Sequence, residues 1–319
     1  MKSPNVSSRD LQEEPSDHET MEKLRALTSW RQDSVDSWID SQRRIESVVR
    51  CAIAFLRVQS SLASGNRIWL LFSGYGINLV PGLWEFCFVG FGFAREANSG
   101  KAEHRFNKES IDAIHRALDE VEKDSKATAL VFTNEGKFFS NGLDLGRIGK
   151  DASMFEAIVA DFHVLLKRVL LFPIPTVAAI CGHAAAGGCM LALACDFRVM
   201  SAERGYIFLS EIDIKIPLTP GMNGLIQSKI LGNALHKAVL TGHKFSAKAG
   251  VESGFIDAAL PDPASTFKEA LDRAKALASR KFDRLVYGTM KREMFKVAVK
   301  ELEDGGFGPI PRPVLLARM

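Results

Sequence analysis

The chain has 319 residues, of which 46% are hydrophobic and 25% charged, a composition typical of one large folded domain or one domain with appendages. Its formal net charge of +3 is small for this length, and no basic run is interleaved with aromatic residues, so nothing in the charge favours nucleic acid as a partner. The five cysteines are an odd count without metal-ligand spacing, which predicts buried thiols in a reducing intracellular compartment and no metal site.

The N-terminal part differs in composition from the rest. Residues 1–20 are rich in Ser, Pro and acids, so we expect a disordered tail and no secretory signal peptide. Apolar residues at three- and four-residue spacing from Met21 to about Leu62 predict one or two amphipathic helices, which could cover the core, contact a partner or lie on a membrane. Residues 68–94 are the most apolar stretch and fit either buried strands and turns or a membrane span, although Pro81 and Glu85 interrupt them. We group residues 21–95 as an atypical extension that includes at most part of a first strand pair.

From residue 96 onward strand and helix patterns alternate. The predicted elements are a helix over Lys108–Lys123, a strand over Ala129–Thr133, a helix over Met154–Leu171 and a strand over Thr176–Ile180. After a tight turn and a run of small residues from Ala184, a helical pattern over Met190–Ala194 follows. This alternation predicts an α/β core with parallel strand crossovers. We place the core at residues 96–260, C-terminal helices at 261–310 and an exposed tail at 311–319.

The C-terminal elements are weaker predictions of the same kind. They are amphipathic helices over Phe267–Ala278 and Leu285–Leu302.

Two loops are candidates for backbone hydrogen bonding to a ligand. At the start of the helix after Thr176–Ile180, Ala186, Gly187 and Gly188 leave the first amides uncovered, which suits a polarised carbonyl or simply allows close helix packing. In the other loop, Asn141-Gly142 permits a tight turn that turns the Leu143 amide outward.

A third segment, from Tyr206 to Ile214, contains acids in an apolar run. Glu211 lies between apolar neighbours, and a carboxylate desolvated there would have a raised pKa suited to proton transfer at neutral pH. The alternative is that Glu211 and Asp213 lie on an exposed strand edge.

Four ordered motifs together resemble one known family. They are EHRFN at residues 103–107, GKFFSNGLDL at 136–145, GHAAAGG at 182–188 and SEIDI at 210–214. The chain is therefore identified as similar to the crotonase (enoyl-CoA hydratase/isomerase) superfamily, and most similar to its branch of plant peroxisomal Δ3,Δ2-enoyl-CoA isomerases. The resemblance implies an α/β fold with a crotonase-like ββα spiral core, a C-terminal helical trimerisation region, and assembly as a homotrimer or a dimer of trimers. It also implies a helix and turn over Leu231–Ala249, followed by a strand over Gly254–Asp257.

The same resemblance implies roles for individual residues. The backbone N–H groups of Leu143 and Gly187 would form an oxyanion hole, and Glu211 would be the catalytic acid and base. Met190 takes the position where hydratases carry a second glutamate. The substrate-binding neighbours would be Ser140, Asn141, Gly142, Asp144, Gly188 and Met190. Lys291 would either contact a CoA phosphate or be an ordinary solvated residue.

The implied reaction moves a 3-cis or 3-trans double bond of an unsaturated fatty acyl-CoA to the 2-trans position during β-oxidation. It needs no metal and no cofactor, since coenzyme A is part of the substrate. Alternatives are dienoyl-CoA isomerase or another crotonase activity, or a catalytically silent acyl-CoA-binding or scaffold protein.

The final residues suggest a location. Ala317-Arg318-Met319 resembles a variant of the peroxisomal Ser-Lys-Leu address, which predicts a peroxisomal protein and an import receptor as partner, with the cytoplasm as the alternative.

Overall fold

The computed structural model describes residues 67–73, 86–91, 103–134, 136–148, 151–203 and 205–308. All of these belong to one compact unit, Leu62–Met319. The predictions for residues 1–20, for Met21 to about Leu62 and for the tail at 311–319 lie outside the described residues.

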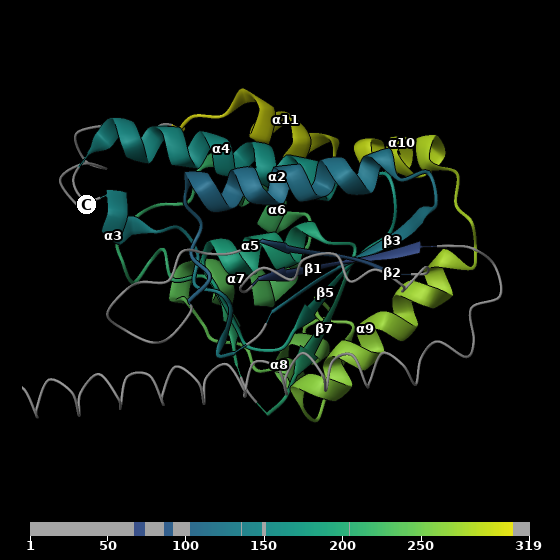
Figure 1. Cartoon of the computed structure of the whole chain (residues 1–319). Helices are drawn as coiled ribbons and strands as arrows, with labels where there is room; N and C mark the ends of the chain where they lie inside the picture. Colours follow the sequence, from purple (N-terminus) through teal and green to yellow (C-terminus); the bar gives the residue numbers. More distant parts are fainter. Residues whose placement is uncertain are drawn as a thin grey trace, which may run out of the picture. The chain divides into compact units, whose positions relative to one another are not determined.

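The core is a six-stranded, wholly parallel sheet (Figure 1). Its order is β2 (Phe86–Phe91), β1 (Arg67–Ser73), β3 (Ala127–Asn134), β5 (Thr176–Ile180), β7 (Phe197–Ser201) and β9 (Ala258–Leu260). Every residue of β5 is buried, as expected for a short β-branched run at the centre of a parallel sheet. Within the apolar segment 68–94, the described residues therefore form strands, and none of the described helices is long and apolar enough to cross a membrane.

A second, three-stranded parallel sheet consists of β4 (Phe138–Ser140), β6 (His183–Ala185) and β8 (Ile207–Phe208). The small residues from Ala184 begin as a strand that the sequence did not indicate, because the backbone of β6 pairs with strands on both sides. Helix α5 (Gly187–Ala194) begins only after this strand ends.

Helices cover the sheets on both sides (Figure 1). The remaining ones are α2 (Lys108–Lys123), α3 (Leu145–Ile148), α4 (Ala152–Leu170), α6 (Pro220–Gln227), α7 (Gly232–Thr241), α8 (Ala247–Glu252), α9 (Pro263–Ala278), α10 (Arg284–Met294) and α11 (Lys296–Asp304). Helix α9 packs against β3, β5 and β7, while α4 packs against α2, α5 and α11. Helix α4 therefore lies between the surface helices and α5.

Capping explains where the longest helices begin. A reciprocal capping box joins Asn107 to Ser110 at α2, another joins Asp262 to Ser265 at α9, and the Asp151 carboxylate accepts two amides at α4. These short polar side chains satisfy backbone donors that the first helical turn leaves free. The predicted starts of these helices therefore agree with the structure to within a few residues.

Two C-terminal predictions are wrong in detail. The segment 285–302 forms two helices, because the chain leaves helical geometry at the buried Phe295. The strand expected over Gly254–Asp257 begins only at Ala258, since Phe255 and Ile256 turn into the core and Asp257 pairs with the backbone of Arg198.

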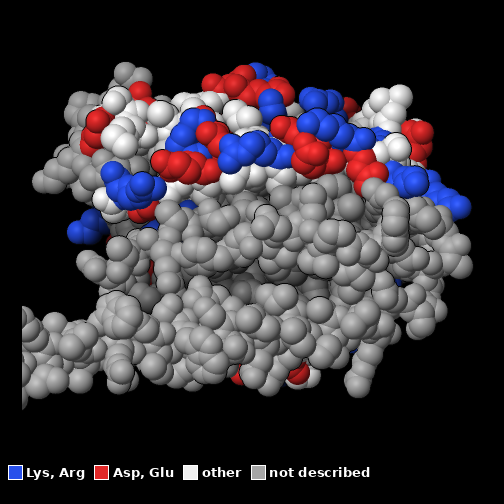
Figure 2. All heavy atoms as spheres, viewed as in Figure 1, with Lys and Arg blue, Asp and Glu red and all other residues white. Residues whose placement is uncertain are grey.

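The surface helices carry charges of both signs side by side. On the face shown in Figure 2, basic and acidic side chains alternate over the described helices. Examples are the pairs Lys108–Asp112 and Lys123–Glu120, and Arg168 of α4 with Asp119 and Glu122 of α2. The described part of this face presents no field of a single sign that would attract a polyanion.

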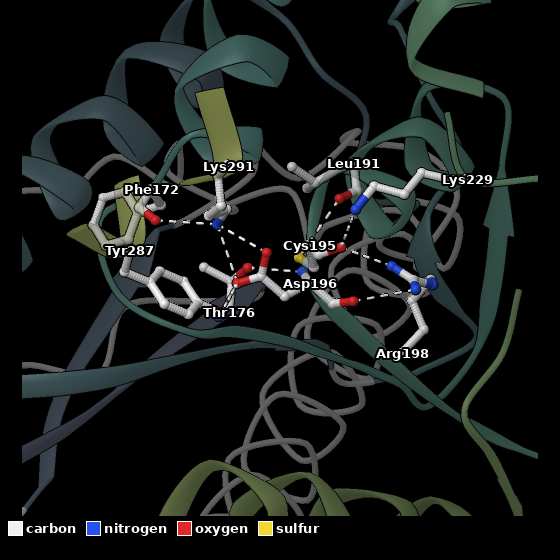
Figure 3. A network of polar contacts seen from close by, with 9 residues as sticks. All are labelled: Phe172, Thr176, Leu191, Cys195, Asp196, Arg198, Lys229, Tyr287 and Lys291. Carbon is white, nitrogen blue, oxygen red and sulfur yellow. Dashed lines mark hydrogen bonds and ion pairs between the residues drawn. The ribbon is translucent and has the colours of Figure 1, made fainter. Parts of the chain in front are cut away.

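A buried polar network fixes the C-terminal end of α5 (Figure 3). The Asp196 carboxylate accepts the Thr176 amide at 2.9 Å and pairs with the Lys291 ammonium at 2.8 Å. The Cys195 carbonyl accepts from Arg198 at 2.7 Å and from Lys229 at 3.2 Å. Burial lowers the pKa of Lys229 to about 7, and the Arg198 charge adds to this effect. The network therefore joins α10 to the junction of β5, α5 and β7.

The ion pair between Lys291 and Asp196 should contribute measurably to stability. Lys291 is 4% exposed and Asp196 10%, so Lys291→Met leaves a carboxylate buried without its cation. We expect the free energy of unfolding to fall by about 3 kcal/mol, measured by urea denaturation. Lys296→Met removes an exposed pair with Glu293 and is the matched control. An equal loss in both variants would contradict the assignment.

Candidate functional site

A cavity of about 220 Å3 lies between the two sheets' loops and helices α4, α5 and α6. Its wall combines a few polar groups with a larger apolar surface, as small-molecule sites do. The polar lining residues are Arg105, Asn141, Ser210, Glu211 and Thr219. Leu143 and Gly187 also line it, together with apolar residues that include Phe155, Val159, Phe162, Met190, Ile214 and Phe307.

Helix α5 presents its first amides to this cavity without a cap. The residue before the helix, Ala186, has φ 49° and ψ −120° and makes no side-chain cap hydrogen bond. Because the Gly187 N–H belongs to the first turn, it has no acceptor within the helix. The positive end of the helix dipole adds to the potential at this point. Gly187 can therefore donate to a ligand oxygen in the cavity.

The second amide comes from the loop after β4. Leu143 forms a parallel bridge with Phe106, in which the Gly142 carbonyl accepts the Phe106 amide at 2.8 Å and the Asp144 amide donates to the Phe106 carbonyl at 2.8 Å. In such a bridge the flanking residues make the bonds, so the Leu143 N–H points to the opposite side. The structure thus brings Leu143 and Gly187, 44 positions apart, to one cavity wall.

Glycines allow these two backbones to approach each other. Gly142 has φ +79°, and a Cβ there would lie 2.9 Å from the Ala186 Cβ. A Cβ on Gly188 would overlap the Ser140 carbonyl. The glycine-rich turn therefore fits both interpretations. Its small residues allow close packing, and this packing brings the two amides to one site where they can bind a ligand.

Glu211 lies in a turn that follows β8. Its Oε2 atom is buried and has no hydrogen-bond partner among the residues that the structure describes, whereas the amides of Ser210 and Glu211 itself bond to the carboxylate. Burial raises the pKa of Glu211 to about 7, and these amide bonds only partly offset the effect. The alternative that Glu211 lies on an exposed strand edge is wrong, since β8 ends at Phe208 and the carboxylate faces the cavity.

Met190 occupies the first turns of α5 and is 1% exposed. It lines the cavity together with Glu211, and Glu211 is the one acidic residue among the described lining residues. A thioether neither accepts nor delivers a proton at neutral pH, so proton transfer within this wall depends on one carboxyl group.

Four predicted substrate-binding residues support the wall and do not line the cavity. The Ser140 hydroxyl is buried and donates to the His104 carbonyl at 2.7 Å. Gly142 and Gly188 act through the close approach just described, and the buried Asp144 carboxylate accepts the Arg147 amide. Asn141 and Met190 do line the cavity, whereas the contacts of Ser140, Gly142, Asp144 and Gly188 with substrate stay predictions.

Lys291 also differs from its predicted role. Its ammonium bonds to the Phe172 carbonyl at 3.0 Å and pairs with Asp196 (Figure 3). Both interpretations of this lysine, a contact with a CoA phosphate and a solvated charge, are wrong because the group is buried and fully engaged.

Several lining residues were not singled out from the sequence. Arg105 pairs with Glu103 at 2.6 Å and reaches the Leu143 carbonyl at 3.5 Å, and the previously predicted Asn141 donates to the same Glu103 carboxylate at 3.0 Å, so polar lining groups are held together beside Leu143. Thr219 bonds through its hydroxyl to the buried His163 at 2.7 Å, and burial lowers the pKa of that histidine to about 4. The Thr-Pro sequence at 219–220 signals a helix start, but it carries no indication that Thr219 faces a cavity.

Comparisons with known proteins agree with this geometry. A family model described as "Enoyl-CoA hydratase/isomerase" matches residues 98–304. Two Arabidopsis thaliana relatives are enoyl-CoA delta isomerase 1, peroxisomal, 33% identical over 65% of this chain and 89% of its own length, and enoyl-CoA delta isomerase 3, 34% identical over 62% and 86%.

A solved structure with the same fold is human mitochondrial delta3-delta2-enoyl-CoA isomerase, with a TM-score of 0.59 and 23% identity, over 64% of this chain and 79% of that one. An enoyl-CoA hydratase/isomerase family protein from Pseudomonas syringae has a TM-score of 0.60 and 26% identity, over 65% and 87%. The fold, the two amides at one cavity and the family match over most of the described core agree, and the chain belongs to the enoyl-CoA hydratase/isomerase family.

Proposed function

We propose that the protein is a Δ3,Δ2-enoyl-CoA isomerase that uses Glu211 as its only proton carrier. The observation that carries the proposal is the buried, unpartnered Oε2 atom of Glu211 in a cavity that also contains Leu143 and Gly187. The names of the Arabidopsis relatives, enoyl-CoA delta isomerases, support the same activity.

The first step removes a proton from C2 of a 3-enoyl-CoA. The Glu211 carboxylate accepts this proton, and the electron pair of the C2–H bond delocalises onto the thioester oxygen and along the C3–C4 double bond. The amides of Leu143 and Gly187 donate to that oxygen as it gains negative charge. Each such donor contributes about 3 kcal/mol in comparable oxyanion sites.

The second step returns the same proton to C4. The Glu211 carboxyl group donates it, a double bond forms between C2 and C3, and the thioester carbonyl is restored. The product is the conjugated trans-2-enoyl-CoA, and atoms and charge balance without a metal or redox cofactor. A carboxyl group with a pKa of about 7 suits both halves of this transfer, because it is neither a strong acid nor fully protonated at neutral pH.

Met190 argues against hydration as the main activity. Adding water needs a second group to orient and deprotonate it, and a buried thioether cannot do so. Dienoyl-CoA isomerisation is disfavoured for a related reason, since the described lining residues contain no further acid.

Location and assembly belong to the same proposal. Two of the Arabidopsis relatives are named peroxisomal, which supports a peroxisomal location. For assembly, we propose that a second copy of the chain covers exposed apolar side chains of α10 and α11. These are Leu285, Val286, Met290, Met294 and Val297, each at least 56% exposed.

Replacing the base should abolish turnover. For Glu211→Gln we expect kcat with a 3-enoyl-CoA to fall at least about 100-fold, because acid–base groups contribute this much or more. The rise in ultraviolet absorbance of the conjugated product measures the reaction. Asp213→Asn removes an exposed carboxylate from the same turn and should leave turnover unchanged. Normal turnover by Glu211→Gln would refute the mechanism.

The raised pKa of Glu211 predicts opposite pH effects on activity and stability. Because the base must be ionised, kcat/KM should rise with pH up to about 7 and then level off. The folded state binds this proton more tightly than the unfolded chain, so the free energy of unfolding should fall as pH rises from about 4.5 to about 7.

The stability effect can be isolated by comparing variants. Urea denaturation at several pH values should show that the free energy of unfolding of the parent protein falls by about 3 kcal/mol across this range. The Glu211→Gln variant should not show this decrease. Asp213→Asn should follow the parent. Parallel stability profiles for the parent and Glu211→Gln would contradict the assigned pKa.

Assembly is tested by charge insertion. Met290→Glu and Met294→Glu together should shift the protein from an oligomer to a monomer in light scattering, because a charge at an apolar interface loses its water. Lys296→Glu on the adjoining helix is exposed and serves as the control. A monomeric parent protein would rule out the proposed contact.

A further inference from the structure

We propose that Phe155 and Phe307 close the far end of the cavity and make the enzyme selective for medium-length acyl chains. The inference rests on the proposed function, since it assigns the chain length of that substrate. It concerns a part of the cavity that proton transfer does not use.

Helix α4 provides the path from the amides to this end. A Cβ on Gly187 would lie 3.0 Å from Cζ of Phe162, so Phe162 adjoins the oxyanion site. Phe162, Val159 and Phe155 all line the cavity, and their spacing of three and four residues puts them on one face of the helix. At a rise of 1.5 Å per residue, Phe155 lies about 10 Å along the helix from Phe162.

Phe307 limits the cavity beside Phe155. The two rings stack with centroids 5.7 Å apart and planes at 24°. Phe155 is 3% exposed, and Phe307 packs against the core and also lines the cavity. Two aromatic faces in contact form a wall that an alkyl chain must displace in order to pass.

The position of Phe307 is set by the segment in which it lies. Helix α11, which precedes it, packs against both α4 and α6. The neighbouring Gly306 and Gly308 have φ of +75° and +66°, so the chain turns sharply on either side of the ring. A Cβ on Gly308 would lie 3.0 Å from Pro220, at the start of α6, which shows how closely this turn is seated. The ring is therefore held by packing on two helices.

The polar lining residues lie beside the other amide. Arg105 reaches the Leu143 carbonyl at 3.5 Å, and both Arg105 and Asn141 are tied to Glu103, so the charged coenzyme portion of a substrate is best accommodated beside Leu143. The acyl chain then runs from Gly187 along α4 towards Phe155. An extended chain advances about 1.2 Å per bond, so about 10 Å accepts roughly eight bonds beyond the carbonyl. A chain of about ten carbons fits, whereas one of sixteen must displace Phe307.

The experiment compares full-length parent protein and Phe307→Ala with 3-enoyl-CoA esters of six, ten and sixteen carbons. The parent should prefer ten carbons over sixteen by about tenfold or more in kcat/KM. Phe307→Ala should raise the value for sixteen carbons by about tenfold and change that for six carbons little, since the short chain stops before the ring. Leu240→Ala, which shortens an exposed side chain of α7 outside the cavity and the proposed interface, should behave as the parent.

A second variant and a binding assay keep the outcome unambiguous. Phe307→Trp enlarges the wall and should lower kcat/KM for ten carbons while sparing six. Calorimetric affinities for saturated decanoyl- and hexadecanoyl-CoA test the same selectivity without turnover. An active enzyme whose ratio of sixteen- to six-carbon rates is the same in all variants overturns this inference alone. Absence of turnover on every chain length refutes the proposed function, and the affinities then decide chain selectivity independently.

Discussion

The close approach of two backbones, at the loop after β4 and at the start of α5, is the constraint on which the site depends. The amides of Leu143 and Gly187 reach one cavity because Gly142 and Gly188 lack a Cβ where the two segments meet. A methyl group on Gly188 would overlap the Ser140 carbonyl, and one on Gly142 would press on Ala186. The small parallel sheet of β4, β6 and β8 fixes the two segments in register. Hydrogen-bonded backbone therefore provides the rigidity that preorganised donors require.

The two ends of α5 differ in whether their terminal backbone groups are hydrogen-bonded, and the proposed mechanism uses this difference. At the C-terminal end, Arg198 and Lys229 donate to the Cys195 carbonyl, which neutralises the negative end of the helix dipole. At the N-terminal end the amides are uncapped, which costs stability but leaves donors for a ligand. The buried charges follow the same division. Asp196 is satisfied by Lys291, whereas the Oε2 atom of Glu211 has no partner within the described chain. The Asp196 carboxylate thus stabilises the fold, whereas the Glu211 carboxylate is the group that we propose accepts a proton.

The proposed chemistry and the proposed chain-length selectivity use different parts of the cavity. Glu211 and the two amides lie at the part assigned to the reacting atoms, and the aromatic face of α4 extends to Phe155. Apolar contacts along that face would discriminate chain lengths by the area they bury. The Thr219 hydroxyl is a polar group in the same wall and is bonded to His163. Its hydrogen-bonded state explains how it is tolerated beside so many apolar groups.

The sequence by itself determined the family, the alternation of strands and helices, and the identity of the central groups. Leu143, Gly187 and Glu211 lie in motifs that resemble those of the family and Met190 closely follows one of them, so the resemblance named the roles expected of these residues. The helix over Lys108–Lys123 agrees at both ends because its cap and its apolar spacing are local properties as well.

Tertiary structure alone decided which neighbours of those groups face the cavity. Ser140, Asp144 and Gly188 share motifs with the central residues, yet they turn into the wall, because adjacent residues in strands and tight turns point in different directions. Lys291 looked like a surface cation and proved to be buried, since its partner Asp196 is 95 positions away. Phe307 and Thr219 reach the cavity only through helix packing. Long-range pairing and packing, which no local pattern encodes, set these positions and the raised pKa of Glu211.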